Sequence, residues 1–137
     1  MLEKSKGIPS AKGYYVAGSG ERFRYDSMTE LAMMMHLDTC DVAWRKNTRL
    51  RIPYVFEGTE RNYVPDFLVD GNRYLPPLIM EIKGREEPEV ESKSEAAKEY
   101  CRKNGMSYSL VPYANVRKLV DWDEVKRYHD EHKGAKR

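Results

Sequence analysis

The alternation of apolar and polar side chains along the chain predicts several helices. A helix is expected over residues 27–38, because Ser27 and Glu30 match a capping box and an apolar helix face follows them. A second helical pattern covers residues 89–104 and ends at an Asn-Gly pair, which is typical of a helix C-terminus. The charged segment of residues 122–132 is predicted to form a closing helix.

Four shorter segments have the composition of strands. Residues 49–57 alternate apolar and polar side chains, and the turn at residues 58–60 predicts that residues 63–70 form the hairpin partner of this strand. Residues 78–83 are predicted to be the central strand, because their apolar run ends at a glycine, and residues 108–111 to be a further short strand. Helices and strands in this order indicate an α/β fold.

The length of the chain favours a single domain. Its 137 residues suffice for a compact α/β core and are too few for two ordinary domains, so we expect one domain over residues 1–137. Residues 1–20 are expected to form a loose arm or irregular edge, and residues 133–137 a frayed end. No apolar run is long enough to span a bilayer and the first residues lack a secretory signal pattern, so a cytoplasmic location is the default expectation.

Positive charge is concentrated in one short segment. The formal net charge of +2 does not by itself indicate nucleic-acid binding. Residues 44–51 nevertheless carry four cations and no acidic residue, namely Arg45, Lys46, Arg49 and Arg51. These side chains would suit contact with a phosphate backbone, and they would equally suit a solvated strand edge whose charges discourage aggregation. Both interpretations stay open at this point.

Three charged residues stand out against the predicted strands. Along residues 78–83 the side chains alternate between the two faces of the sheet, so Glu81 and Lys83 share one face. Charged groups within an otherwise apolar strand are costly unless they are paired or bind a metal ion. Asp66 would lie beside this pair if its own strand and residues 78–83 form a hairpin. The three side chains would then make a cluster of two carboxylates and one amine.

Such a cluster suits the hydrolysis of phosphodiester bonds. Two carboxylates bind a hard divalent cation through oxygen, and Mg²⁺, for which Mn²⁺ is a possible substitute, prefers few protein carboxylates together with water and substrate phosphate. The cation would activate a water molecule and neutralise charge in the transition state. Lys83 would orient that water or stabilise charge on phosphorus, and Lys93 would reach the scissile phosphate or remain a solvated helix lysine. The alternative is a buried salt-bridge network without activity.

The same residues carry a resemblance to a known superfamily. Val64-Pro65-Asp66-Phe67, followed 14 positions later by Glu81-Ile82-Lys83, resembles the PD-(D/E)xK signature of restriction endonuclease-like nucleases. From about residue 25 to residue 104, the sequence further resembles the C-terminal endonuclease domain of type III restriction enzymes. The matching features are Asp26-Ser27-x-Thr29-Glu30, Trp44-x-Lys46, Ile52-Pro53, Tyr63-x-Pro65-Asp66-Phe67, Glu81-x-Lys83-Gly84, Lys93 and Ala96-Ala97.

This resemblance implies a restriction endonuclease-like fold, a mixed β-sheet flanked by helices, and Mg²⁺-dependent cleavage of DNA. It identifies Asp66, Glu81 and the carbonyl of Ile82 as metal ligands. Lys83 matches the catalytic lysine. Glu30 matches an acidic residue that the superfamily often adds to the metal or its water shell from the first helix, although this residue would equally serve the capping box.

The wider system stays open. The chain has no Gly-rich phosphate loop of a motor, so it resembles either the cleavage domain of a type III restriction-like system or a mobile-element nuclease such as one of the TnsA type. The expected function is a Mg²⁺-dependent DNA endonuclease with a helicase-like translocase or a specificity subunit as partner. Cutting both strands would need a homodimer or two copies in a complex. The alternatives are a resolvase of Holliday junctions or branched DNA, and an inactive nuclease-fold module that binds DNA or protein.

Overall fold

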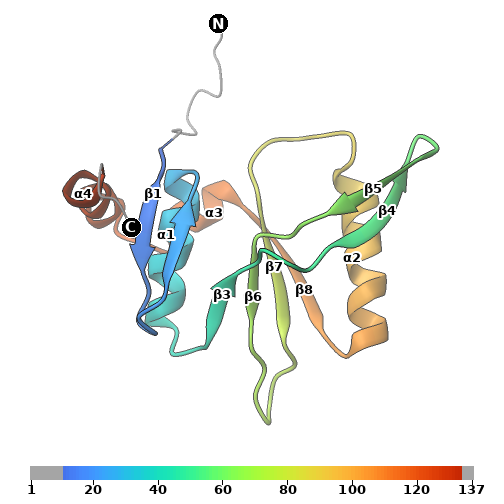
Figure 1. Ribbon diagram of the computed structural model, residues 1–137, viewed down its shortest axis with the longest axis horizontal. Helices are drawn as coiled ribbons and strands as arrows, with labels where there is room; N and C mark the ends of the chain where they lie inside the picture. The colour runs from blue at the N-terminus through green and yellow to red at the C-terminus, as the bar shows by residue number, and fades with distance from the viewer. Residues whose placement is uncertain (1–10, 134–137) are drawn as a thin grey trace, which may run out of the picture. The chain divides into compact units, whose positions relative to one another are not determined.

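The chain divides into two compact units. The computed structural model describes residues 11–133 (Figure 1). The first unit combines residues 1–42 with residues 112–137, and the second unit contains residues 43–111. The expectation that the whole chain is one domain stays a prediction.

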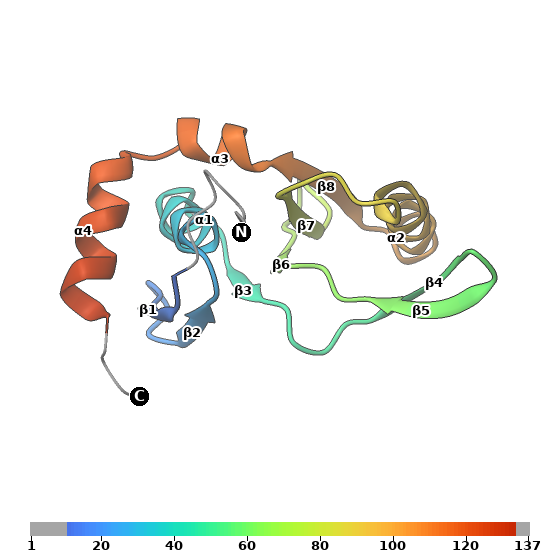
Figure 2. The ribbon, with the colours of Figure 1, turned by 90° about the horizontal axis from the view of Figure 1, so that it is seen from above.

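Two strands and three helices form the described part of the first unit. Strands β1 (Gly13–Val16) and β2 (Arg22–Tyr25) pair as an antiparallel hairpin. Helix α1 (Met28–Thr39) follows, and helices α3 (Tyr113–Lys118) and α4 (Trp122–His132) come from the other end of the chain. Both of these helices pack against α1, and α4 also contacts β1; Figure 2 shows α1 between α3 and the hairpin.

The loose arm expected for residues 1–20 is wrong for the segment that forms β1. The side chain of Tyr15 is buried, and its ring lies edge-on to Tyr128 with 5.2 Å between the ring centroids. Its hydroxyl donates a hydrogen bond of 2.5 Å to Asp38. These long-range contacts order a segment whose glycines had indicated irregular structure. The prediction failed because local composition does not show which distant side chains will pack against the segment.

Helix α1 begins where the capping box predicts. The hydroxyl of Ser27 accepts a hydrogen bond of 3.1 Å from the Glu30 N–H, and the Glu30 carboxylate accepts one of 2.8 Å from the Asp26 N–H. These bonds satisfy backbone donors that the first helical turn leaves without partners. Leu31 and Met34 on the apolar face are fully buried. The predicted first helix is therefore confirmed.

Four strands form a sheet in the second unit, in the spatial order β3, β6, β7, β8. Strand β6 (Phe67–Val69) pairs antiparallel with β3 (Trp44–Lys46) on one side and with β7 (Leu78–Lys83) on the other. Strand β8 (Ser107–Pro112) begins beside the start of β7, because its first N–H donates to the carbonyl of Pro77 at 2.8 Å. The two strands therefore run in the same direction, as Figure 1 shows, and the sheet is mixed.

A separate hairpin packs against the helix that connects β7 to β8. The hairpin consists of β4 (Ile52–Phe56) and β5 (Thr59–Tyr63), and the helix is α2 (Val90–Asn104). The turn between β4 and β5 consists of Glu57 and Gly58, both in the left-handed region with φ of 51° and 79°. Two consecutive residues with positive φ are typical of the tight turn that matches the twist of paired strands.

The hairpin, α2 and β7 share one hydrophobic core. Its side chains are nearly or fully buried, so they hold β7 against α2 and the hairpin. The helix ends at Gly105, whose φ of 66° is the left-handed C-terminal geometry that the Asn-Gly pair predicts. The buried members of this core are Ile52, Tyr54, Tyr63, Ile79, Ala97 and Cys101.

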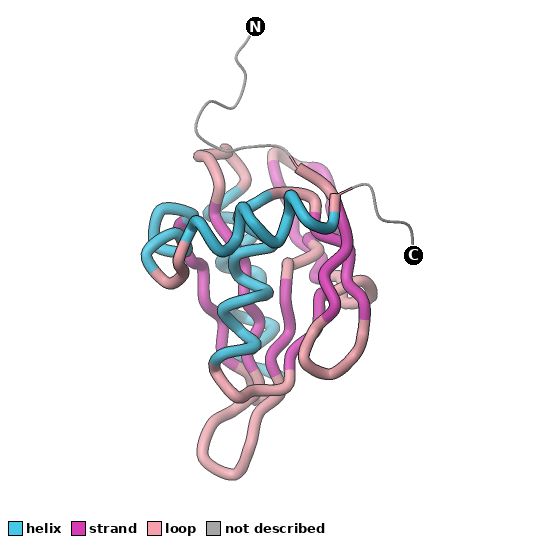
Figure 3. The backbone as a smooth tube through the Cα atoms, turned by 90° about the vertical axis from the view of Figure 1, so that its left-hand side faces the viewer, coloured by secondary structure: helices cyan, strands magenta, loops and turns pink. Residues whose placement is uncertain are grey.

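Most of the predicted architecture is confirmed. The chain is an α/β protein with a mixed sheet and accompanying helices, compatible with a restriction endonuclease-like fold (Figure 3). The predicted central strand and the two later helices are present. No helix in the described part of the chain is long and apolar enough to cross a membrane. Residues 1–10 of the predicted arm and residues 134–137 of the predicted frayed end lie outside the described residues.

One predicted strand pairing is wrong. Residues 63–70 were expected to pair with the strand before them, whereas β5 is that partner and β6 belongs to the other sheet. The turn at Glu57 and Gly58 reverses the chain within two residues, so pairing starts at Thr59. Pro65 has no N–H to donate and separates β5 from β6.

Candidate active site

Asp66 and Glu81 face each other across the β6 and β7 strands. The register pairs Phe67 with Met80, which places Asp66 opposite Glu81 one position beyond the ladder. The Asp66 N–H donates a hydrogen bond of 3.0 Å to Glu81 Oε1, and the Ile82 N–H donates one of 2.7 Å to Asp66 Oδ2. Two carboxyl groups therefore meet at the end of the central strand, each fixed by a backbone donor of the other strand.

The electrostatics of this pair are unfavourable for two ionised carboxylates. Burial and, to a smaller extent, the neighbouring charge of Asp66 together raise the pKa of Glu81 to about 8. Hydrogen bonds from Tyr63 and from the Asp66 N–H act in the opposite direction, as does the charge of Lys93. A site that holds two partly buried carboxyl groups together favours a proton or a cation between them.

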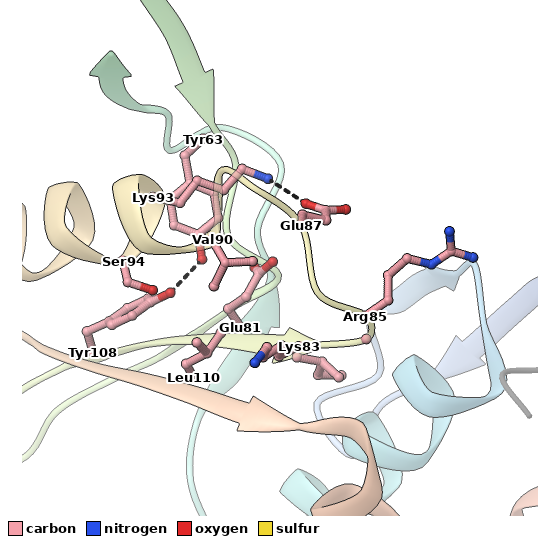
Figure 4. Close-up of a pocket in the computed structure, with 12 residues that line it drawn as sticks. Tyr63, Glu81, Lys83, Arg85, Glu87, Val90, Lys93, Ser94, Tyr108 and Leu110 are labelled. Carbon is pink, nitrogen blue, oxygen red and sulfur yellow. Dashed lines mark hydrogen bonds and ion pairs between the residues drawn. The ribbon is translucent and has the colours of Figure 1, made fainter. Parts of the chain in front are cut away.

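A chain of hydroxyl groups supports Glu81 from the core. The hydroxyl oxygens of Tyr63 and Tyr108 lie 2.9 Å apart, and the Tyr63 hydroxyl is also hydrogen-bonded to the Glu81 carboxylate (Figure 4). Either hydroxyl of the Tyr63 and Tyr108 pair could be the donor between them, and Tyr63 donates to Glu81 when that group is ionised. Burial, followed by the charge of Glu81, raises the pKa of Tyr63, so this donor stays protonated at neutral pH. Ser94 hydrogen-bonds to Tyr108.

Two lysines line the pocket that Glu81 enters. The pocket has a volume of about 160 Å³. Lys83 extends into it from the end of β7 and forms an ion pair with Glu86, whose carboxylate is 82% exposed. Lys93 on α2 lies 3.5 Å from a Glu87 carboxylate oxygen and 5.6 Å above the ring of Tyr63 (Figure 4). Both lysine side chains are about three-quarters buried, with 27% and 28% exposed.

These positions differ in one respect from the cluster that the sequence predicts. Asp66 was expected to complete a cluster with Glu81 and Lys83, whereas Lys83 shares the pocket with Glu81 and forms its ion pair with Glu86. Since Glu86 is exposed and close in sequence, this pair is weak and a phosphate group would displace it readily. The role of Lys93 stays a prediction, although it lines the pocket rather than lying on a fully solvated helix face.

The donor set fits a hard divalent cation. Asp66 and Glu81 provide carboxylate oxygens, and Ile82, which also lines the pocket, provides a backbone carbonyl. Among the described residues no group of three or more histidine, cysteine, aspartate or glutamate side chains could hold a metal ion. A site with only two carboxylates suits Mg²⁺, which keeps several water ligands and binds substrate phosphate.

Glu30, the fourth predicted catalytic residue, lies in the first unit. Its carboxylate accepts the Asp26 N–H, which is the capping role that the sequence had offered as the alternative. Its predicted contribution to a metal or its water shell stays a prediction.

The predicted DNA-binding cations occupy one edge of the sheet. Arg45 and Lys46 lie on β3, the edge strand of the sheet, and Arg45 Nη1 lies 3.3 Å from the Asp70 carboxylate. Arg49 and Arg51 follow in the connection to β4 and are exposed. The strand-edge interpretation therefore describes Arg45 and Lys46, and DNA contact by the four cations stays a prediction.

Sequence reasoning missed several polar residues of this region. Tyr63 was noted only as part of a matching motif, and Tyr108, Ser94 and Asn47 were not identified at all. Asn47 is 6% exposed and bonds to the backbone beside Asp66. The Asn-Thr-Arg sequence is compatible with a side-chain turn, but the residues that meet these groups are distant in sequence. Their roles therefore depend on strand pairing.

Comparison with known proteins identifies the family. A family model described as TnsA-like endonuclease N terminal matches residues 41–112, which is more than half of the chain. The match includes Asp66, Glu81 and Lys83. No curated protein and no solved structure matches the chain. The specific resemblance to type III restriction enzymes is not confirmed, whereas the PD-(D/E)xK signature agrees with the matched family. The chain belongs to the TnsA-like endonuclease N-terminal family, a restriction endonuclease-like family of nucleases.

Proposed function

We propose that this protein is a Mg²⁺-dependent DNA endonuclease that hydrolyses phosphodiester bonds, in a mobile-element setting. The observation that carries the proposal is the meeting of Asp66 and Glu81 at the end of β7, beside a pocket lined by two lysines. Membership of an endonuclease family supports the reaction class. The ion pair that Lys83 forms is with Glu86, so this pair does not support the alternative of a salt-bridge network without activity.

The roles follow from the position of each group. Asp66, Glu81 and the Ile82 carbonyl would hold Mg²⁺, with Mn²⁺ as a substitute. When bound, such a cation supplies charge neutralisation and a more acidic water molecule. Lys83, at the pocket wall, would hold the attacking water or a phosphoryl oxygen in place of Glu86. Lys93 would contact the same phosphate from α2, where Glu87 now accepts its charge.

The substrate is proposed to be DNA, with specificity supplied from outside this chain. The described residues contain no zinc-binding cluster, and no motif of the sequence predicts a helix-turn-helix. We therefore infer sequence-nonspecific cutting in isolation and a partner that selects the site, such as a translocase or specificity subunit. Two copies would be needed to cut both strands. A type III restriction-like setting stays a prediction.

The test is cleavage of supercoiled, linear and branched DNA with Mg²⁺ or Mn²⁺. Wild-type protein should cut in either metal, and Glu81→Gln, which keeps the shape of the side chain, should not. Lys98→Ala is the matched control, because Lys98 lies on the exposed face of α2, with 63% of its side chain exposed.

Each outcome has a defined meaning. Strong preference for branched DNA would replace the proposal with a junction resolvase. Absence of cutting together with absence of Mg²⁺ binding would replace it with an inactive nuclease-fold module. Equal cutting by wild type and Glu81→Gln would place the active site elsewhere.

A further inference from the structure

One residue of the loop between β3 and β4, Asn47, forms hydrogen bonds to the backbone of the proposed active site. We call residues 47–51 the basic loop. The Asn47 N–H donates a hydrogen bond of 2.9 Å to the Asp66 carbonyl, and Asn47 Nδ2 donates one of 2.9 Å to the Pro65 carbonyl. Asn47 therefore holds the Pro65 carbonyl and the Asp66 carbonyl, which come immediately before and after the Asp66 Cα along the backbone.

The same side chain also shapes the basic loop. Asn47 Nδ2 donates to the Leu50 carbonyl at 3.0 Å, and Asn47 Oδ1 accepts from the Arg49 N–H at 3.2 Å and from the Leu50 N–H at 2.9 Å. Asn47 is 6% exposed, and an unpaired amide at that depth would be costly. Every hydrogen-bonding group of its side chain is used, so the loop and the Asp66 backbone are expected to move as one body.

The outer surface of this loop is cationic. Arg49 and Arg51 are exposed, and the Arg51 guanidinium donates to the Thr48 and Arg49 carbonyls at 3.4 and 3.1 Å. A groove of about 380 Å³ beside it is lined by residues 45–50 and Leu68, with three cations and no carboxylate among these lining residues. An exposed guanidinium group that the carbonyls of its own loop partly order, such as that of Arg51, is suited to binding phosphate groups.

We infer that the basic loop is a binding surface for the phosphate backbone of double-stranded DNA, and that Asn47 is a positioning residue that fixes this surface relative to Asp66. Arg49 and Arg51 hold a phosphate beside the scissile one, and Asn47 sets the spacing between that phosphate and the carboxyl pair. The inference rests on the proposed function for its substrate and specifies which part of the second unit holds the DNA.

Binding is tested without any divalent cation, so that it is measured apart from cleavage. The full chain is titrated onto a fluorescent DNA duplex at several salt concentrations. The Arg49→Ala/Arg51→Ala variant should bind more weakly, and its slope of log affinity against log salt should be smaller by about 2, since each phosphate contact contributes about 0.9.

The control variant is Lys98→Ala/Arg102→Ala, which removes two positive charges from the exposed face of α2, where these side chains are 63% and 69% exposed. It should retain the wild-type salt slope. Equal slopes for the wild type and the Arg49→Ala/Arg51→Ala variant would overturn the proposed DNA surface, whether or not the protein cleaves DNA. If the salt slopes of DNA binding are as predicted but the wild-type protein does not cleave DNA, only the proposed reaction would be overturned.

Asn47 is tested with Asn47→Ser. A serine hydroxyl still accepts from the loop N–H groups, more weakly, and has no second donor for the Pro65 carbonyl. In this variant the Mg²⁺ affinity measured by calorimetry and the kcat should both fall by about 10-fold or more. Unchanged Mg²⁺ affinity and kcat in the folded variant would overturn the positioning role.

The wild-type protein gives a second readout that does not depend on the folding of a variant. If Asn47 couples the loop to the carboxyl pair, Mg²⁺ should slow hydrogen exchange at the Arg49 and Leu50 amides, which both donate to Asn47 Oδ1. Amides of the β4 and β5 hairpin turn, such as Thr59, serve as the reference. Mg²⁺ binding without any change at Arg49 and Leu50 would overturn the coupling.

Discussion

Helix α1 of the first unit and strand β7 of the second show two different uses of burial. On α1 the buried positions are almost all apolar, and its two carboxylates, Glu30 and Asp38, lie near the helix ends. On β7 an apolar residue, Ile79, is fully buried, while Glu81 and Lys83 on the same face are only partly exposed and line a pocket. The first pattern maximises burial of apolar surface. The second pattern places the charged side chains of Glu81 and Lys83 in partly buried positions, which costs stability. Such departures from an apolar core are expected at functional sites.

The largest effect that this comparison predicts is on catalysis through Lys83. Lys83→Ala should lower the cleavage rate by about 10²- to 10³-fold, because a charge that stabilises the transition state is removed. Stability should change by less than about 1 kcal/mol, since the lysine has only an exposed ion-pair partner. Single-turnover cleavage and urea unfolding measure the two quantities. A large loss of stability with an unchanged rate would make Lys83 a structural residue.

The opposite result is expected for the core of α1. Met34→Ala removes a fully buried side chain and should lower the free energy of unfolding by about 2–5 kcal/mol. Urea unfolding of the full chain measures this loss. Thr39→Ala, at the exposed end of the same helix, is the control and should cost little. Equal stability of the two variants would mean that the apolar face of α1 does not hold the first unit together.

The carboxyl pair predicts an unusual dependence of stability on pH. The pKa of Glu81 is raised from 4.5 in the unfolded chain to about 8 in the fold by burial and by Asp66. Below pH 4.5 the group is protonated in both states and its contribution is fully present. Between pH 4.5 and about 8 the unfolded chain ionises this group while the fold keeps it protonated, so the free energy of unfolding of the metal-free protein should fall over this range and level off above it.

Glu81→Gln sharpens that measurement. The variant cannot ionise, so its metal-free stability should fall less than that of the wild type over the same pH range. Saturating Mg²⁺ should also reduce the fall in the wild type, because a bound cation favours the ionised pair. Identical pH profiles for wild type and variant would show that Glu81 titrates at an ordinary pKa in the fold.

The smallest predicted effect concerns the hydroxyl chain behind Glu81. Tyr63→Phe removes the donor to the Glu81 carboxylate and should weaken Mg²⁺ binding by about 10-fold, as loss of an outer hydrogen bond to a metal ligand typically does. Tyr54→Phe removes a hydroxyl from the same core and should leave Mg²⁺ affinity unchanged. Calorimetry compares the two, and equal affinities would limit Tyr63 to packing.

The elements that could be predicted from the sequence are those governed by local signals. Ser27 and Glu30 fix the start of α1, Gly105 fixes the end of α2, and the apolar run of β7 ends where Gly84 follows it. The carboxyl pair was also predictable, because Asp66 and Glu81 interrupt apolar segments at positions that an antiparallel pairing brings together.

The errors and omissions depend on contacts between distant segments. Strand β1 is ordered by Tyr15, which packs on Tyr128 more than one hundred positions later. The partner of β4 was misassigned, because the reversal at Glu57 and Gly58 is tighter than the predicted three-residue turn. The role of Asn47 could not be predicted, since the carbonyl groups that it binds belong to a different strand connection.

The central claim is that Asp66 and Glu81 form the metal-dependent centre of a DNA endonuclease. It is tested most directly by the nicking of supercoiled DNA as the Mg²⁺ concentration is raised, with wild-type protein and with Asp66→Asn compared at equal folded concentration. The account predicts nicking that saturates with Mg²⁺ in the wild type and stays at background in the variant. Nicking by Asp66→Asn at the wild-type rate and Mg²⁺ dependence would contradict the account.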